Sequence, residues 1–179
     1  MFKTIAKKSV YLLIIMSMLL IVNLASAKNT NTLDVSITSD STAITYSNET
    51  TSFEYVYTPD YITCETSALI SPKTGGYLYL SSAMWLYVPP KAFNTKTTIS
   101  AHFEWYTDYI DFVFGPSPMS FAVPLKLFIS WYDINQMGLL FDPSLFYDDG
   151  VGTPVYYTED AFGITYYLEH FSIYYFRRR

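Results

Sequence analysis

The side chains best suited to chemistry in this sequence are two histidines and the hydroxyls beside them. A catalytic metal site needs histidine and acidic ligands at short helical spacing, and neither His102 nor His170 has such neighbours. His102 precedes Glu104 on the polar side of an alternating segment, where we expect it to be solvated. Ser172 follows His170 by two residues, but the sequence contains no Gly-x-Ser-x-Gly elbow typical of a hydrolase.

Acidic residues near a turn and a single cysteine are the other candidates for metal chemistry. Asp148-Asp149-Gly150, with Asp133 and Asp142 upstream, could offer oxygen ligands to calcium, but the spacing fits no calcium loop and is typical of a hairpin turn. Cys64 cannot form an internal disulfide or a thiolate zinc site alone. We interpret it as a buried apolar residue, with intermolecular pairing as the alternative, and we predict no metal and no cofactor.

The aromatic content is high, with 18 Tyr, 13 Phe and 3 Trp in 179 residues. One interpretation is that these rings fill a thin core and stabilise pairs between strands. The other is an exposed tyrosine-rich patch that binds another protein or a surface glycan. The candidate binding residues are tyrosines at paired or alternating positions: Tyr55, Tyr57, Tyr77, Tyr79, Tyr156 and Tyr157.

The charge balance argues against nucleic acid as a partner. The formal net charge is −5, whereas proteins that bind nucleic acid concentrate Lys and Arg on phosphates. The chain of 179 residues has the length of one domain, and half of its residues are hydrophobic, which is sufficient for a core.

Residues 1–27 have the features of a secretory signal. A basic start with three lysines precedes an uncharged apolar run over residues 10–22 and the triplet Ala25-Ser26-Ala27. We predict cleavage after Ala27 and a secreted or extracytoplasmic protein. The alternative is an uncleaved membrane anchor over residues 9–27, the one case in which we expect contact with a membrane.

The rest of the chain predicts an all-β fold. Residues 28–52 form a Ser/Thr-rich spacer with a weak strand at residues 33–37, and residues 53–179 form the domain. In residues 97–105, Ile99, Ala101, Phe103 and Trp105 alternate with polar residues, as in a half-buried strand. The other predicted strands are 53–57, 77–80, 84–88, 110–114, 125–132, 144–147, 155–158 and 164–176.

Pro and Gly turns separate these strands, and we predict an antiparallel β-sandwich without a helix of ten residues. A small outer-membrane β-barrel is the remote alternative. It would need a uniformly apolar outer face, whereas the outward positions of 97–105 are Thr98, Ser100, His102 and Glu104.

A series of short segments resembles the ZU-five domain, a family named after zona occludens and the uncoordinated netrin receptors and also found in ankyrins and secreted bacterial proteins. The resemblance covers residues 69–176. Its segments are Gly75-Gly76-Tyr77-Leu78, residues 86–93, Thr97-Thr98-Ile99-Ser100, Phe114-Gly115-Pro116-Ser117, Phe121, Pro124 with Leu125-Lys126-Leu127, and His170-Phe171-Ser172-Ile173-Tyr174. Where the family has glycine in two turns, this chain has Lys91 and Pro118, so we expect both turns to be built differently.

The resemblance implies a β-sandwich used for protein contacts, and we predict an exported, non-catalytic module for protein interaction or a structural role at the cell surface. It also implies an alternative, self-cleavage between Phe171 and Ser172 with His170 as the general base. Residues i and i+2 of a regular strand lie ~6.6 Å apart, so this chemistry requires a bulge or sharp twist at Phe171. Without it, Leu168, His170, Ser172, Tyr174 and Phe176 would share one face of a plain final strand.

Overall fold

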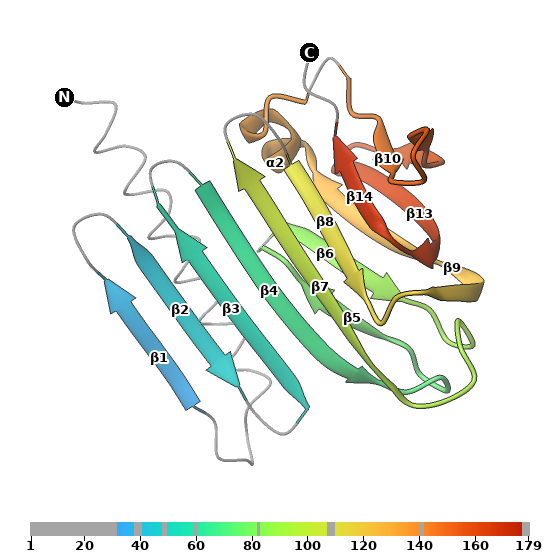
Figure 1. The fold of residues 1–179 in the computed structure, drawn as a ribbon, viewed down its shortest axis with the longest axis horizontal. Coiled ribbons are helices and arrows are strands. Elements are labelled where there is room, and N and C mark those ends of the chain that lie inside the picture. Colours follow the sequence, from blue (N-terminus) through green and yellow to red (C-terminus); the bar gives the residue numbers. More distant parts are fainter. Residues whose placement is uncertain are drawn as a thin grey trace.

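The computed structural model describes residues 32–37, 41–47, 50–58, 61–81, 83–106, 110–139 and 142–176. These residues form two antiparallel sheets that pack face to face, which confirms the predicted all-β sandwich (Figure 1). The predicted signal sequence, residues 1–27, lies outside the described residues. Within the described ranges, no helix has both the length and the apolar character needed to cross a membrane.

The larger sheet has nine strands in the order β1-β2-β3-β4-β7-β8-β14-β10-β11. Every pairing in it is antiparallel. Its strands are β1 (Thr32–Ile37), β2 (Thr42–Ser47), β3 (Thr51–Tyr57), β4 (Tyr61–Ile70), β7 (Thr97–Tyr106), β8 (Ile110–Gly115), β14 (Ile173–Phe176), β10 (Leu145–Tyr147) and β11 (Thr153–Pro154).

The smaller sheet has five strands in the order β12-β13-β9-β6-β5. They are β12 (Tyr157–Glu159), β13 (Gly163–Phe171), β9 (Met119–Ser130), β6 (Met84–Val88) and β5 (Gly76–Tyr79). A short helix, α2 (Trp131–Gln136), follows β9 directly. Ser130 caps this helix, because its side chain accepts a hydrogen bond from the Asp133 N–H at 3.1 Å.

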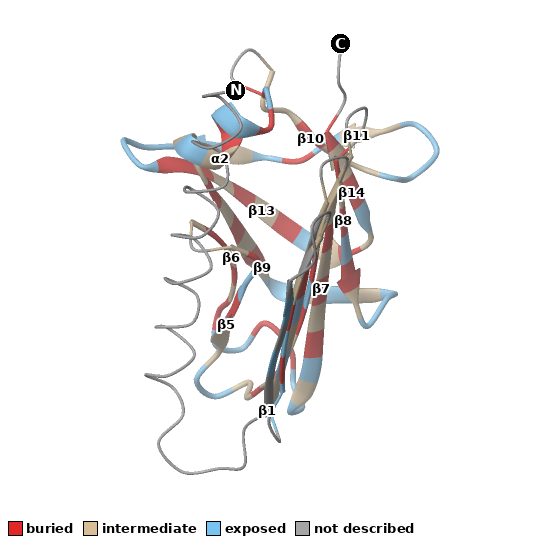
Figure 2. Cartoon of the chain, turned by 90° about the vertical axis from the view of Figure 1, so that its left-hand side faces the viewer, coloured by how far each residue is buried: buried red, intermediate tan, exposed pale blue. Residues whose placement is uncertain are grey.

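The core lies between the two sheets, where buried positions of both layers face each other (Figure 2). The predicted alternation in residues 97–105 is confirmed, because Ile99, Ala101 and Phe103 are buried. The same holds for Leu125 and Leu127 in β9. Side chains of period two therefore divide each strand into a core face and an outer face, as a pleated backbone requires.

The larger sheet extends into the range predicted as a spacer. Strands β1 and β2 lie within residues 28–52, and β3 begins at Thr51. The many Thr residues there are β-branched and suit a strand, and Ile44 and Tyr46 of β2 are buried. Strand β4 was also missed by the sequence pattern, and it includes Cys64.

Two of the predicted strands differ in extent from the observed ones. The segment 125–132 leaves the sheet after Ser130 and continues as α2. The segment 164–176 is divided at Ser172, because β13 belongs to the smaller sheet and β14 to the larger one. A register shift between Leu168 and His170 changes the alternation, so that Phe171 is buried at the end of β13.

The turn at Lys91 differs from our expectation. Lys91 has φ of 65°, the left-handed conformation that a glycine would adopt at this position. The lysine therefore does not prevent the glycine-type turn. The Lys91 N–H donates to the Pro72 carbonyl at 2.8 Å, which stabilises this backbone in spite of its conformational cost.

Candidate functional site

The outer face of the smaller sheet carries two rows of side chains that point away from the core. In the first row, Tyr77, Tyr87, Lys126 and Tyr167 lie opposite one another across β5, β6, β9 and β13. In the second row, Tyr79, Trp85, Phe128, Thr165 and Thr158 lie opposite one another, from β5 to β12. Opposite residues of neighbouring strands point to the same side of a sheet, so both rows form one surface.

The rings of these rows are in contact with one another. The Tyr77 ring lies 4.7 Å from Tyr87, 5.6 Å from Trp85 and 6.1 Å from Tyr79, measured between centroids. The Trp85 ring stacks on Phe128 at 4.9 Å. These contacts hold the side chains in defined orientations before any partner binds, which lowers the entropy cost of binding.

The far end of the surface is formed by Tyr156 and Tyr167, whose ring centroids are 5.3 Å apart. Lys126 Nζ lies 5.6 Å from the centre of the Tyr167 ring, within the range of a cation–π contact. We call this surface the aromatic face, and it consists of Tyr77, Tyr79, Trp85, Tyr87, Lys126, Phe128, Tyr156 and Tyr167.

The predicted tyrosines fall into two groups. Tyr77, Tyr79 and Tyr156 belong to the aromatic face and are 49%, 44% and 69% exposed. Tyr157 lies opposite the buried Tyr166 on the core side of the same sheet, where it packs against the core. Tyr55 is buried in the larger sheet, so its ring is not available for an exposed patch, and the side chain of Tyr57 lies outside the described residues.

Trp85, Tyr87, Lys126 and Phe128 were not among the predicted binding residues. The alternation of the sequence does place two of them on the outer face of β6, because Trp85 and Tyr87 flank Leu86, which is buried. What the sequence does not contain is the register between β6 and β9, which brings Trp85 opposite Phe128.

The outer face of the larger sheet differs from the aromatic face in its charge. It carries five ionisable side chains at paired positions: Glu54, Glu65, His102, Glu104 and Asp111.

His102 has a side-chain partner within the fold, and Cys64 lies in the core. His102 Nε2 lies 2.8 Å from Glu104 Oε1, and both side chains are about one-third exposed. Cys64 is free and fully buried, and burial raises the pKa of its thiol. A buried, protonated thiol is a poor nucleophile and cannot reach a cysteine of another chain.

The aspartates near residue 148 hold a turn. Among the described residues no group of three His, Cys, Asp or Glu side chains is arranged to bind a metal ion. The Asp149 carboxylate accepts hydrogen bonds from the Thr153 hydroxyl at 2.6 Å and from the N–H groups of Gly152 and Val151 at 2.6 and 3.0 Å. These bonds hold the pKa of Asp149 well below its usual range.

Replacement of Asp149 by alanine is expected to lower the melting temperature at pH 7 and to have a decreasing effect below about pH 4. Because the pKa of Asp149 is lowered in the folded state, its stabilisation is present above the unfolded pKa and is lost as the pH falls through the folded one. Thermal unfolding at pH 7 and pH 2 measures this difference. Asp148→Ala is the control, since the Asp148 carboxylate accepts one hydrogen bond from the described part of the chain, from the Gly150 N–H to Oδ1 at 3.3 Å. Equal melting temperatures of the two variants at pH 7 would show that the hydrogen bonds of the Asp149 carboxylate do not stabilise the fold.

The segment His170-Phe171-Ser172 lies where the chain crosses from one sheet to the other. The Phe171 carbonyl accepts a hydrogen bond from Ser117 Oγ at 3.3 Å, and the His170 carbonyl accepts one from the Tyr174 hydroxyl at 2.5 Å. The His170 ring packs edge-on against Tyr147 at 4.7 Å between centroids. In the described part of the chain, no hydrogen bond joins the His170 ring to the Ser172 hydroxyl.

No family model, no curated protein and no solved structure matches this chain.

Proposed function

We propose that this chain is an exported, non-catalytic β-sandwich module that binds another protein through its aromatic face. The observation that carries the proposal is the group of exposed rings, Tyr77, Tyr79 and Tyr156, on the outer side of the smaller sheet. Tyr and Trp side chains supply most of the binding energy of many protein interfaces, because they add a large contact area with few rotatable bonds. The signal-like residues 1–27 support a location outside the cytoplasm.

The composition of the aromatic face favours a protein over a glycan. Oriented binding of a polar ligand uses several precisely placed polar groups, among them hydroxyls, amides and charged side chains. The paired rows contain no carboxylate and no amide, and their polar groups are the tyrosine hydroxyls, the Trp85 indole N–H, Thr158, Thr165 and Lys126. An apolar anchor with a nearby carboxylate for Lys126 would complement this surface.

The test is binding of the purified protein to cell-surface material of the producing organism. Replacement of both Tyr77 and Tyr79 by serine is expected to weaken binding about 10- to 100-fold, because two exposed anchors are removed without a change in the core. Phe162→Ser is the matched control, since the Phe162 side chain is 77% exposed but lies in the turn between β12 and β13, outside the aromatic face.

Treatment of the surface material distinguishes the two partner classes. If a protein is bound, protease treatment abolishes binding and periodate oxidation of glycans leaves it intact. Loss of binding after periodate alone would instead assign a glycan. Equal binding of the wild type and the Tyr77/Tyr79 variant would overturn the aromatic face as the binding surface.

A second candidate function is self-cleavage between Phe171 and Ser172. Two observations favour it, the register shift before His170 and the hydroxyl of Ser117 on the Phe171 carbonyl. A donor at this oxygen would stabilise the negative charge that develops when the carbonyl carbon is attacked. Ser172 connects β13 of the smaller sheet to β14 of the larger one, so strands hold the chain on both sides of the Phe171–Ser172 peptide bond.

The proposed reaction begins with attack of Ser172 Oγ on the Phe171 carbonyl carbon, while His170 accepts the hydroxyl proton. The C–N bond then breaks, the proton passes to the Ser172 nitrogen, and an ester remains between the two residues. Water hydrolyses this ester, which gives a carboxylate on Phe171 and a free hydroxyl on Ser172. Rotation of the His170 ring toward Ser172 is required for the first step.

The intact mass of the freshly denatured protein tests this reaction. The proposal predicts two fragments, one ending at Phe171 and one beginning at Ser172, and a single intact chain for Ser172→Ala. Ser117→Ala is expected to slow cleavage by about 100- to 1,000-fold, as the loss of an oxyanion donor does elsewhere. A wild-type sample that contains only the uncleaved chain would contradict the reaction.

A further inference from the structure

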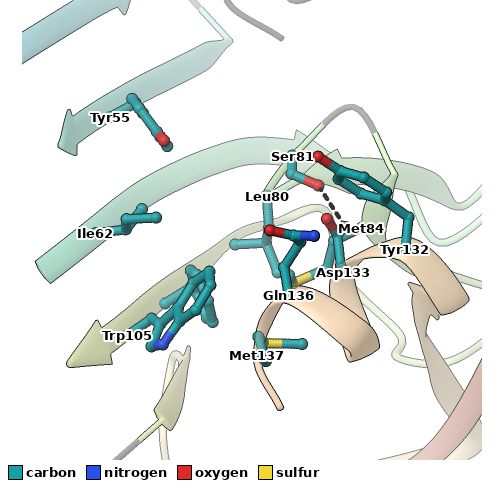
Figure 3. Close-up of a pocket in the computed structure, with 11 residues that line it drawn as sticks. Tyr55, Ile62, Leu80, Ser81, Met84, Trp105, Tyr132, Asp133, Gln136 and Met137 are labelled. Atoms are coloured by element: carbon teal, nitrogen blue, oxygen red, sulfur yellow. Dashed lines mark hydrogen bonds between the residues drawn. The ribbon is translucent and has the colours of Figure 1, made fainter. Parts of the chain in front are cut away.

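A pocket distinct from the aromatic face opens between the larger sheet and α2 (Figure 3). Its floor is formed by Ile62, Phe103 and Trp105, which lie on the inner side of β4 and β7. The opposite wall is formed by Met84 of β6 and by Met137 at the end of α2. The pocket has a volume of about 60 Å³ and is open to solvent at its mouth, so a small ring or a short alkyl chain would lie partly in the mouth.

One side of this apolar pocket carries a carboxylate. Asp133 Oδ2 accepts a hydrogen bond from Ser81 Oγ at 3.1 Å, and Figure 3 shows this pair beside the Tyr132 ring. Burial raises the pKa of Asp133, because the charged form loses water without gaining a cation. None of the described residues that line the pocket is Lys, Arg or His.

The charge distribution selects the chemistry of a ligand. An anionic ligand would meet the Asp133 carboxylate without a compensating cation, which is unfavourable in a partly buried site. A cationic group would pair with this carboxylate and could also contact the π faces of Tyr132 and Trp105. The apolar floor would then accept the hydrophobic part of the same molecule.

We propose that this pocket binds a small primary amine with an apolar body. The ammonium group donates to Asp133, and the body occupies the space between Ile62, Phe103 and Met84. Gln136, which lines the mouth on the same helix, offers an amide to a further polar group of the ligand. This inference is independent of the aromatic face, which lies on the other side of the smaller sheet.

Calorimetric titration of the full chain with 2-phenylethylamine tests the proposal at neutral pH, with 2-phenylethanol as the neutral probe of the same shape. The amine is expected to bind at least about 10-fold more tightly than the alcohol, corresponding to the ~1.4 kcal/mol of one charge-assisted hydrogen bond. In Asp133→Asn this preference is expected to disappear while the alcohol binds as before. Equal binding of amine and alcohol to the wild type, or no binding of the amine, would overturn the proposal.

A second pair of variants keeps the test valid if Asp133→Asn fails to fold. Gln136→Lys places a cation three residues from Asp133 on the same helix, where it can pair with the carboxylate. Asn135→Lys adds the same charge at a neighbouring exposed position that does not line the pocket. Gln136→Lys is expected to reduce amine binding at least about 10-fold, whereas Asn135→Lys binds as the wild type does. Equal amine affinity of the two variants would contradict a site at Asp133.

Discussion

Replacement of Phe112 by alanine is expected to lower the free energy of unfolding by about 3–5 kcal/mol. Phe112 is fully buried in β8, and its ring lies 5.0 Å from Phe103 of β7 and 6.0 Å from Phe176 of β14. Its removal leaves a cavity that three neighbouring strands of the larger sheet would have to fill. Urea unfolding followed by circular dichroism measures the change.

Phe162→Ala is the matched control, because the Phe162 side chain is 77% exposed. Its effect is expected to remain within about 0.5 kcal/mol, as for most surface substitutions. A loss below about 1 kcal/mol for Phe112→Ala would show that the ring does not occupy the core as described.

Replacement of Gly163 by alanine is expected to destabilise the smaller sheet by about 3 kcal/mol. A Cβ atom at Gly163 would lie 2.3 Å from the Ile129 carbonyl oxygen and 2.8 Å from the Ser130 Cα, both backbone atoms of β9. Backbone atoms cannot rotate away, so β13 and β9 would have to separate at this end. Chemical denaturation measures the loss.

Gly115→Ala provides the comparison, because its Cβ would meet the Ser100 Oγ at 2.6 Å and no backbone atom within 4 Å. The serine side chain can change its rotamer, so the expected loss is smaller than for Gly163→Ala. If the two variants were equally stable, β13 and β9 would not approach each other as closely as described.

The alternation of the sequence predicted the faces of several strands correctly. In β7, Ile99, Ala101 and Phe103 are buried, and Trp105 on the same face packs partly buried against the core. Leu125 and Leu127 of β9 are also buried, because each period of two places the same side chains on one face. Strand β6 was predicted with its observed bounds, Met84–Val88, for the same reason. Local pattern was sufficient wherever one face of a strand is apolar and the other is more polar.

Prediction failed where long-range pairing determines the structure. Strand β4 combines Cys64 and Thr66, both buried, with exposed and half-buried neighbours, so its pattern is weak until β3 and β7 pair with it. A weak strand was predicted at residues 33–37, within β1, but β2 is Ser/Thr-rich, and its pairing with β1 and β3 identifies both as part of the sheet. The crossing at Ser172 follows a register shift that no local signal indicates.

The candidate site was predictable in part. Tyr77, Tyr79 and Tyr156 were recognised from composition and alternation, but their neighbours on the aromatic face come from other strands. The contact of Trp85 with Phe128 joins positions more than 40 residues apart, and it depends on the register of β6 against β9. A single sequence does not contain this information.

Hydroxyl-radical footprinting of the protein, free and bound to cell-surface material, tests the central claim most directly. We expect the aromatic face to be protected on binding, with lower oxidation of Tyr77, Tyr79 and Tyr156, each at least 44% exposed in the free chain. Oxidation of Val113 and Ile173, which are exposed on the outer face of the larger sheet, should be unchanged. Protection of Val113 and Ile173 with unchanged oxidation of the three tyrosines would contradict the account.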